Sequence, residues 1–219
     1  MSERETHDIV ELARAKVNLT LKVVGRLPNG YHALESLVAF AETPADIVTL
    51  SPGPEPGVTV TGPGSSAIVG ENLVARALRL AAEADPELVL GHVTLDKHLP
   101  VAAGVGGGSA DAAAILRAVR RANPSRAAGV DWPAIALKLG ADVPVCLDGR
   151  AALMWGIGER ILTAPALPEL PTVIVNPMQP VPADKTAQVF RRLGAAALPS
   201  ADLAEPACPA GLRDVADVA

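Results

Sequence analysis

The stretch that most constrains the fold is "LPVAAGVGGGSADAAAIL", residues 99–116, where a glycine-rich loop runs directly into an alanine-rich helical pattern. Four of the five residues from 104 to 108 are glycine. Glycine adds no side chain to a core, and it loses more backbone entropy on folding than any other residue. We therefore expect a loop of this kind where another group must approach the backbone closely.

A phosphate is one such group. The first N–H groups of a helix lack internal partners, and the helix dipole adds positive potential there. A glycine run lets these N–H groups close on a phosphate. We expect Ser109 at the N-cap, where its hydroxyl can bond the helix backbone or reach a phosphate or a metal ion. The alternative is a flexible turn capped by serine, and composition alone does not decide between the two.

Two familiar phosphate motifs do not fit this loop. A Walker A loop ends in Gly-Lys-Ser/Thr, whereas this loop ends in Gly-Ser. A dinucleotide fingerprint needs a third glycine where Ser109 stands, and an acidic residue at the end of a second strand about 20 residues on. The residues around Asp131 do not form such a strand pattern. The sequence therefore fits neither a Walker A loop nor a dinucleotide fingerprint.

Composition limits the remaining classes. The chain has 219 residues, 49% of them hydrophobic and only 2% aromatic, so alanine, valine and leucine must fill the core. The net charge of −5 argues against a general nucleic-acid or membrane-surface binder. Cys146 and Cys208 form no CxxC pair, which suits a reducing compartment without structural zinc. Without a signal peptide or a long apolar run, the sequence predicts a cytoplasmic protein.

Periodicity predicts a mixed set of elements. Residues 13–23 alternate between apolar and polar side chains, which is typical of a half-buried strand. A helix after the glycines would bury one stripe and expose the other. The expected strands are 13–23, 46–50, 58–62, 92–99 and 172–177, the expected helices are 71–84, 109–121, 132–140 and 186–194, and a hairpin is expected over 151–162. Strands dominate the first third and then mix with helices, so the predicted class is α+β.

The loop, with Pro100 before it and Asp111-Ala112-Ala113 after it, resembles the second motif of the galactokinase, homoserine kinase, mevalonate kinase and phosphomevalonate kinase (GHMP) superfamily. Three further stretches are similar to one branch, the kinases of bacterial isoprenoid synthesis that act on a diphosphocytidyl sugar alcohol. These are "ARAKVNLTLKVVGRLPNGYHALES", "LGADVP" and "GIGERI". The resemblance covers residues from about 10 to 193.

This resemblance implies a two-lobed fold. Residues 1–165 would form an ATP-binding lobe like domain 2 of ribosomal protein S5, and residues 166–219 part of a ferredoxin-like lobe. The implied reaction moves the γ-phosphate of ATP, with Mg²⁺, to the 2-hydroxyl of a small cytidine diphosphate substrate. No nucleic-acid or membrane partner is implied, and the oligomeric state stays open.

The resemblance also implies roles for residues that composition leaves ambiguous. Lys16 would stabilise the transferring phosphoryl group and Asp142 would act as general base, although a solvated strand face and a turn are the ordinary settings for such residues. Cytosine would stack on Tyr31 and be read by His32. The remaining implied residues are Asn18 and Phe190 for substrate, and Asn72, Lys97, Pro100, Gly104, Gly106, Gly107, Gly108 and Ser109 for ATP. No carboxylate cluster marks a metal site.

One expected motif is missing. The superfamily has a third glycine-rich motif near the C-terminus, and the residues after Leu193 contain none. The alternatives are therefore a nucleotide-binding paralogue or fragment with impaired catalysis, or another small-molecule kinase of the superfamily, of the homoserine or mevalonate type.

Overall fold

The computed structural model describes residues 7–68, 70–176, 182, 185–199 and 203–206. The chain forms two compact units that are interleaved in sequence. The first comprises residues 1–16 and 41–149, and the second residues 17–40 and 150–219. Two strands, β1 (Ile9–Asn18) and β3 (His32–Pro52), run from one unit into the other. The expected lobe boundary at residue 165 stays a prediction.

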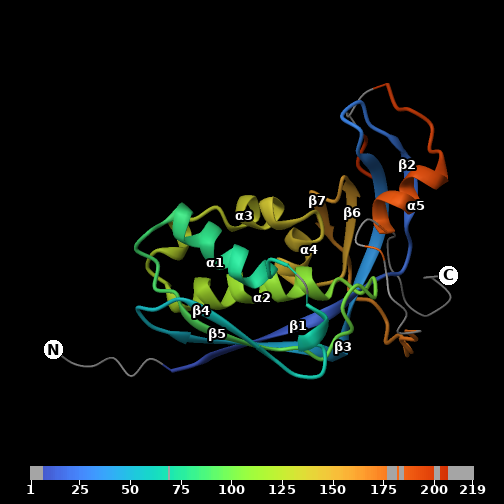
Figure 1. The fold of residues 1–219 in the computed structure, drawn as a ribbon. Helices are drawn as coiled ribbons and strands as arrows, with labels where there is room; N and C mark the ends of the chain where they lie inside the picture. The colour runs from blue at the N-terminus through green and yellow to red at the C-terminus, as the bar shows by residue number, and fades with distance from the viewer. Residues whose placement is uncertain (1–6, 69, 177–181, 183–184, 200–202, 207–219) are drawn as a thin grey trace. The chain divides into compact units, whose positions relative to one another are not determined.

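The first unit is a sheet covered by helices. β4 (Gly57–Thr61) pairs in parallel with β5 (Gly91–Asp96), and β5 pairs antiparallel with the later part of β3, from Ile47↔Asp96 to Pro52↔Gly91. The helices are α1 (Leu73–Ala84), α2 (Gly107–Ala122), α3 (Trp132–Leu139) and α4 (Val143–Asp148). Figure 1 shows α1 and α2 on one side of β4 and β5.

Helix α2 lies at the centre of this unit. It contacts α1, α3 and α4. Small alanine side chains allow close packing, and the predicted apolar stripe is confirmed because Ala112, Ile115, Leu116 and Val119 are all buried. Buried methyl-rich surface of this kind contributes about 25 cal/mol per Å². The dense packing of α2 fixes the position of its N-terminus and of the loop before it.

The second unit is built on an antiparallel sheet. β2 (Lys22–Arg26) pairs with the first part of β3, with an irregularity between Val23 and Gly25. On the other side of β3, β6 (Ala152–Gly156) pairs from Leu34↔Gly156 to Val38↔Ala152. The predicted hairpin is confirmed, because β7 (Arg160–Thr163) pairs antiparallel with β6. Helix α5 (Lys185–Leu193) follows.

Two local expectations differ from the structure, and one helix was not expected. The predicted strand over 13–23 is interrupted between β1 and β2, because the amides of Leu19 and Thr20 both turn to the carbonyl of Leu37. Residues 171–176 form no strand, since alternating valines give strand propensity but not a pairing partner. Val173 and Val175 are accordingly 86% and 84% exposed. Pro177 lies outside the described residues, and α4 was not expected.

Candidate functional site

The glycine loop begins α2 earlier than the sequence suggests. Gly104 and Gly106 have φ angles of 81° and 68°, in the left-handed region that favours glycine. Gly106 is the N-cap, and its carbonyl accepts a hydrogen bond from the Ala110 amide at 2.8 Å. The prediction that Ser109 is the N-cap is therefore wrong. The left-handed turn at Gly106 starts the helix at Gly107, so that Ser109 lies in the first turn.

Lys16 and Asp142 form an ion pair within the first unit. The Lys16 ammonium lies 3.4 Å from a carboxylate oxygen of Asp142, with the lysine 3% and the aspartate side chain 43% exposed. Lys16 therefore does not belong to a solvated strand face. Asp142 stands at the N-cap of α4, directly after the break at Gly140 that ends α3. The ion pair joins a buried cation to a carboxylate that solvent and ligands can reach.

The glycine loop contacts the same lysine. The amide of Lys16 donates to the carbonyl of Val105 at 2.8 Å. A Cβ at Gly106 would lie only 3.1 Å from Lys16 Cβ, so the absence of a side chain there permits this approach. The loop, Lys16 and Asp142 are thus fixed together in one unit.

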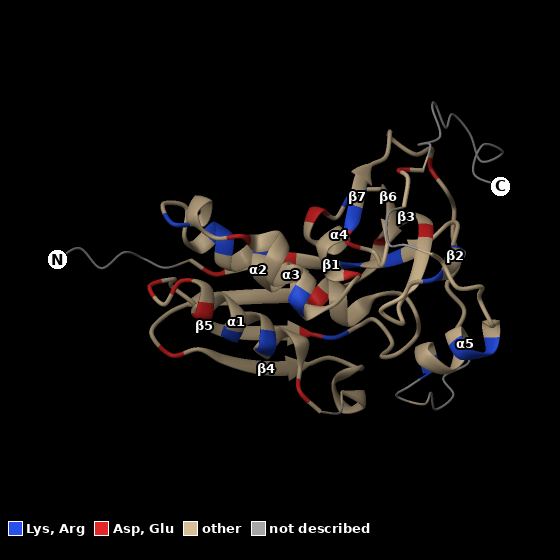
Figure 2. Cartoon of the chain, turned by 90° about the horizontal axis from the view of Figure 1, so that it is seen from above, with Lys and Arg blue, Asp and Glu red and all other residues tan. Residues whose placement is uncertain are grey.

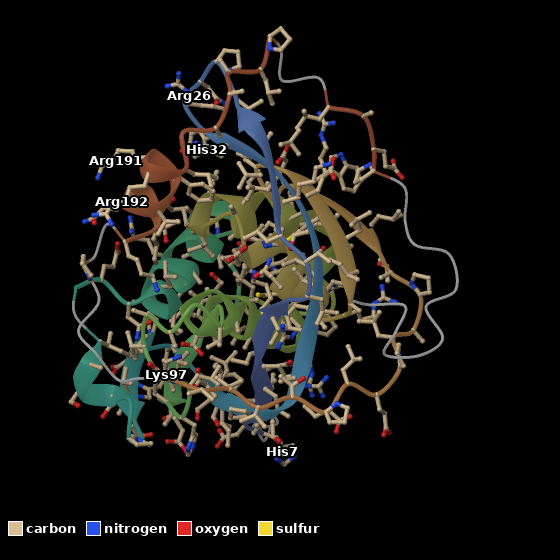
Figure 3. The ribbon with its side chains drawn as sticks, turned by 90° about the vertical axis from the view of Figure 1, so that its right-hand side faces the viewer. His7, Arg26, His32, Lys97, Arg191 and Arg192 are labelled. Carbon is tan, nitrogen blue, oxygen red and sulfur yellow. The ribbon has the colours of Figure 1, made fainter. Side chains whose placement is uncertain are left out.

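Lys97 is also buried rather than an ordinary surface lysine. It directly follows β5 and is 3% exposed. Its Nζ donates to Asp46, and it also donates to Asp111, at a distance of 2.7 Å. A Cβ at Gly107 would lie 3.1 Å from the Lys97 ammonium. Lys97 is labelled in Figure 3. The two consecutive glycines 106 and 107 therefore lie against two different lysines.

Asp111, one turn into α2, has an unusual environment. Burial raises the pKa of Asp111 to about 7, an effect that the Lys97 ammonium partly offsets and the Asp46 carboxylate reinforces. One oxygen accepts from Lys97, and the other is buried with no hydrogen-bond partner in the described part of the chain. A buried, unpartnered acceptor is costly, which marks this end of α2 as a place for a ligand or a proton.

A cavity of about 310 Å³ opens at the glycine loop. All eight residues expected to bind ATP line it: Asn72, Lys97, Pro100, Gly104, Gly106, Gly107, Gly108 and Ser109. Asn72 caps α1 by accepting from the Val74 amide at 2.8 Å, and its buried side-chain nitrogen has no partner in the described residues. The cavity therefore offers backbone N–H groups and an amide donor to an anionic, polar ligand.

Sequence reasoning missed Asp46. It is fully buried, and its carboxylate accepts from the amides of His98 and Leu99, both at 2.6 Å, as well as from Lys97. In the sequence it is only the first residue of the strand "DIVTL". The available signal was that Asp46 shares one face of the strand with Val48 and Leu50, which are both buried, and a buried carboxylate requires a paired charge.

Cys146 is a buried thiol. Burial raises the pKa of its thiol to about 12, and the residue is 2% exposed.

Among the described residues, no group of three or more histidine, cysteine or acidic side chains could hold a metal ion. No helix in the described ranges is long and apolar enough to cross a membrane.

The second unit holds the residues expected to bind substrate. Tyr31 is 62% exposed beside a turn in which the Asn29 side chain accepts from its amide. The rings of His32 and Phe190 stack with centroids 4.7 Å apart and an angle of 18°. Figure 3 shows His32 beside α5, the helix that carries Phe190. Asn18 donates to Ser36 at 2.7 Å. The structure thus brings His32 and Phe190 together, whereas the roles of all four residues stay predictions.

The fold and the loop define a class of protein. Residues 72–150 match the GHMP kinases N terminal domain family. The crystal structure of a 4-(cytidine 5'-diphospho)-2C-methyl-D-erythritol kinase aligns with a TM-score of 0.60 and 42% identity, over 73% of this chain and 56% of that one. The crystal structure of homoserine kinase from Cytophaga hutchinsonii, at 18% identity and a TM-score of 0.54, shares the fold. The predicted α+β class and GHMP kinase fold are confirmed.

Sequence relatives narrow the class. A 4-diphosphocytidyl-2-C-methyl-D-erythritol kinase of Rhodopseudomonas palustris (strain ATCC BAA-98 / CGA009) is 48% identical over 99% of this chain and 73% of its own length. One from Bradyrhizobium sp. (strain ORS 278) is 54% identical over 86% of this chain. This chain belongs to the family of 4-diphosphocytidyl-2-C-methyl-D-erythritol kinases. It spans 62% of the length of the Bradyrhizobium relative and 60% of another from that genus.

Proposed function

We propose that this chain transfers the γ-phosphate of ATP to the 2-hydroxyl of 4-diphosphocytidyl-2-C-methyl-D-erythritol. The observation that carries this proposal is the Lys16–Asp142 ion pair at 3.4 Å, joined through Lys16 to the glycine loop. Phosphoryl transfer depends mostly on positioning and electrostatics. A cation, a carboxylate and a phosphate-binding loop held in one unit supply these.

In the proposed step, the Asp142 carboxylate accepts the proton of the 2-hydroxyl. The freed oxygen forms a bond to the γ-phosphorus while the bond from that phosphorus to the bridging oxygen of ADP breaks. Lys16 stabilises the negative charge that spreads over the transferring group. The partial exposure of Asp142 supports this assignment, because a general base must reach the substrate hydroxyl.

The cavity at the glycine loop supports ATP as the donor. The backbone N–H groups of residues 107–109 would hold phosphate oxygens, and the α2 dipole favours their charge. Oxygen donors suit Mg²⁺, which typically takes one or two carboxylates together with substrate phosphates. The Ser109 hydroxyl and the unpartnered oxygen of Asp111 are such donors beside the loop, and the ion would neutralise phosphate charge when bound.

The second unit supports a cytidine diphosphate acceptor. The exposed ring of Tyr31, one residue before the stacked His32–Phe190 pair, offers an aromatic face to a pyrimidine. Arg191 and Arg192 lie in the last turn of α5, drawn blue in Figure 2, on the helix that carries Phe190. Positive charge on this helix suits a diphosphate.

The test measures ADP release and the phosphorylated product with ATP, Mg²⁺ and the diphosphocytidyl substrate. Asp142→Asn keeps the size of the side chain and removes the base, so we expect kcat to fall by about 10²–10⁴-fold. Asp131→Asn is the matched control, because Asp131 caps α3 through the Ala134 amide and asparagine caps a helix equally well. Equal loss in both variants contradicts the proposed role.

The same experiment addresses a second candidate, a nucleotide-binding protein without turnover. The observation that favours it is the cavity at the glycine loop, whose lining residues all belong to the first unit, whereas the residues expected to bind the acceptor belong to the second. ATP binding without substrate-dependent ADP release, unchanged by Asp142→Asn, would support this alternative. Competition by cytidine diphosphate would in turn separate the proposed acceptor from homoserine or mevalonate.

A further inference from the structure

Asp46 makes three hydrogen bonds from one fully buried carboxylate. Two of them come from the backbone amides of His98 and Leu99, just after β5, and the third from the Lys97 ammonium. Asp46 is not among the residues expected at the site, and it does not line the cavity at the glycine loop. Any influence on a ligand must therefore pass through the groups that it holds.

Lys97 is the group through which Asp46 can act. The backbone of Lys97 is fixed on both sides, because its amide donates to Thr61 at 2.9 Å and its carbonyl accepts from Gly64 at 2.9 Å. The side chain then extends to the start of α2, where its ammonium bonds Asp111 and lies 3.1 Å from where a Cβ at Gly107 would stand. Asp46 and Asp111 hold this ammonium from two elements, β3 and α2.

Electrostatics explain why Lys97 needs the negative charge of Asp46. The N-terminus of α2 carries the positive end of the helix dipole, and a buried ammonium beside it is repelled and poorly solvated. Asp46 supplies a compensating negative charge. Without it, the ammonium is expected to move away from Gly107 or to draw in water, and either change disturbs the loop that rests on it.

We propose that Asp46 is a positioning residue that holds the Lys97 ammonium against Gly107 and thereby keeps the glycine loop in the conformation that accepts nucleotide phosphate. This inference rests on the proposed function, because it presumes that ATP binds at the loop. It makes Asp46 a determinant of ATP affinity although the residue lies outside the cavity.

The first test combines kinetics with direct ATP binding. Asp46→Asn keeps an acceptor for the two amides but offers no negative charge to Lys97. We expect the KM and Kd for ATP to rise by about tenfold, the scale of a lost charged hydrogen bond, with kcat and the KM for the diphosphocytidyl substrate within about twofold. A merely structural defect would instead lower the active fraction, and so kcat, without changing the KM for ATP.

The matched control is Asp96→Asn. Asp96 lies two residues before His98 at the end of β5 and bonds the exposed His98 ring rather than Lys97. We expect wild-type ATP affinity from this variant. If Asp96→Asn weakens ATP binding as much as Asp46→Asn, or if Asp46→Asn leaves the Kd for ATP unchanged, the inference is overturned.

A double variant covers the case in which Asp46→Asn alone does not fold. Asp46→Asn/Lys97→Met removes both charges and leaves no unpaired buried ammonium. If Asp46 acts through Lys97, the double variant binds ATP as Lys97→Met does; a further loss overturns the inference. Wild-type protein that binds ATP but transfers no phosphate contradicts the proposed function and leaves this comparison valid. Wild-type protein that does not bind ATP contradicts both.

Discussion

The backbone amide of Lys16 donates to the carbonyl of Val105 at 2.8 Å, so a residue of β1 fixes the middle of the glycine loop. The side chain of the same lysine reaches Asp142. One residue therefore connects the loop that would hold the donor phosphate to the carboxylate that would activate the acceptor.

Replacing the Lys16 side chain should damage catalysis more than folding. In Lys16→Met the backbone bond to Val105 persists, while the positive charge beside Asp142 is lost. We expect kcat to fall by about 10²–10³-fold, the effect of removing one electrostatic stabiliser of a transition state. Lys22→Met is the control, since Lys22 pairs with Glu35 on an exposed surface of the second unit. Steady-state ADP release measures both; equal activities would remove Lys16 from the mechanism.

Adding a methyl group at Gly106 should disturb the loop itself. Gly106 has a φ of 68°, and an added Cβ would meet Lys16 Cβ at 3.1 Å. A left-handed conformation costs a non-glycine residue about 1–2 kcal/mol. We therefore expect Gly106→Ala to lower the free energy of unfolding by about that amount and to weaken ATP binding.

Gly129→Ala provides the comparison, because no atom lies within 4 Å of the Cβ that it adds. Its effect on the free energy of unfolding should stay within about 1 kcal/mol. Urea denaturation and ATP titration measure the two variants. Wild-type stability and ATP affinity in Gly106→Ala would show that the loop tolerates a side chain at this position.

Much of this arrangement is visible in the sequence, and the rest is not, for physical reasons. The helical spacing of 71–84 and the alanine stripe after the glycines report burial directly, and both helices form. Asp46 was missed because its partners Lys97, His98 and Leu99 lie more than 50 residues away, across the β3–β5 pair. Strand periodicity gives the face on which a residue lies but not the charge that it meets.

The start of α2 and the unpaired segment 172–176 also differ from what the sequence predicts. Ser109 is a good N-cap by type, but the left-handed Gly106 begins α2 before it. Residues 172–176 have the composition of a strand, and the described structure gives them no pairing partner. Local preference predicts an element only where tertiary contacts agree with it.

The raised pKa of Asp111 predicts a pH-dependent stability. Its pKa of about 7 in the folded state lies above the ordinary aspartate value of 3.8, so between these pH values the folded state holds a proton that the unfolded state has lost. The free energy of unfolding should therefore fall as pH rises from about 4 to about 7, and this contribution should level off above 7. Asp111→Asn should remove that slope. Its free energy of unfolding relative to that of the wild type should therefore be higher at pH 8 than at pH 5.

Denaturation of wild type, Asp111→Asn and Asp96→Asn at several pH values measures this effect. Asp96→Asn is the control for removing a carboxylate, because Asp96 bonds the His98 ring and the Thr61 hydroxyl rather than Lys97 or Asp46. An Asp111→Asn profile parallel to that of the wild type would show that Asp111 is already ionised at pH 5.

The aromatic ring of Tyr31 should matter for the acceptor and not for ATP. The residue is 62% exposed, so its truncation removes little packing and Tyr31→Ala should change the free energy of unfolding by less than about 0.5 kcal/mol. Stacking of a base on an aromatic side chain contributes about 1–3 kcal/mol. We therefore expect the KM for the diphosphocytidyl substrate to rise by about 5–150-fold in Tyr31→Ala, with the KM for ATP unchanged.

Tyr31→Phe keeps the ring, and its KM for the diphosphocytidyl substrate should stay close to that of the wild type. If Tyr31→Phe loses as much as Tyr31→Ala, the hydroxyl rather than the ring face contacts the substrate, and if neither changes the KM, the cytosine binds elsewhere.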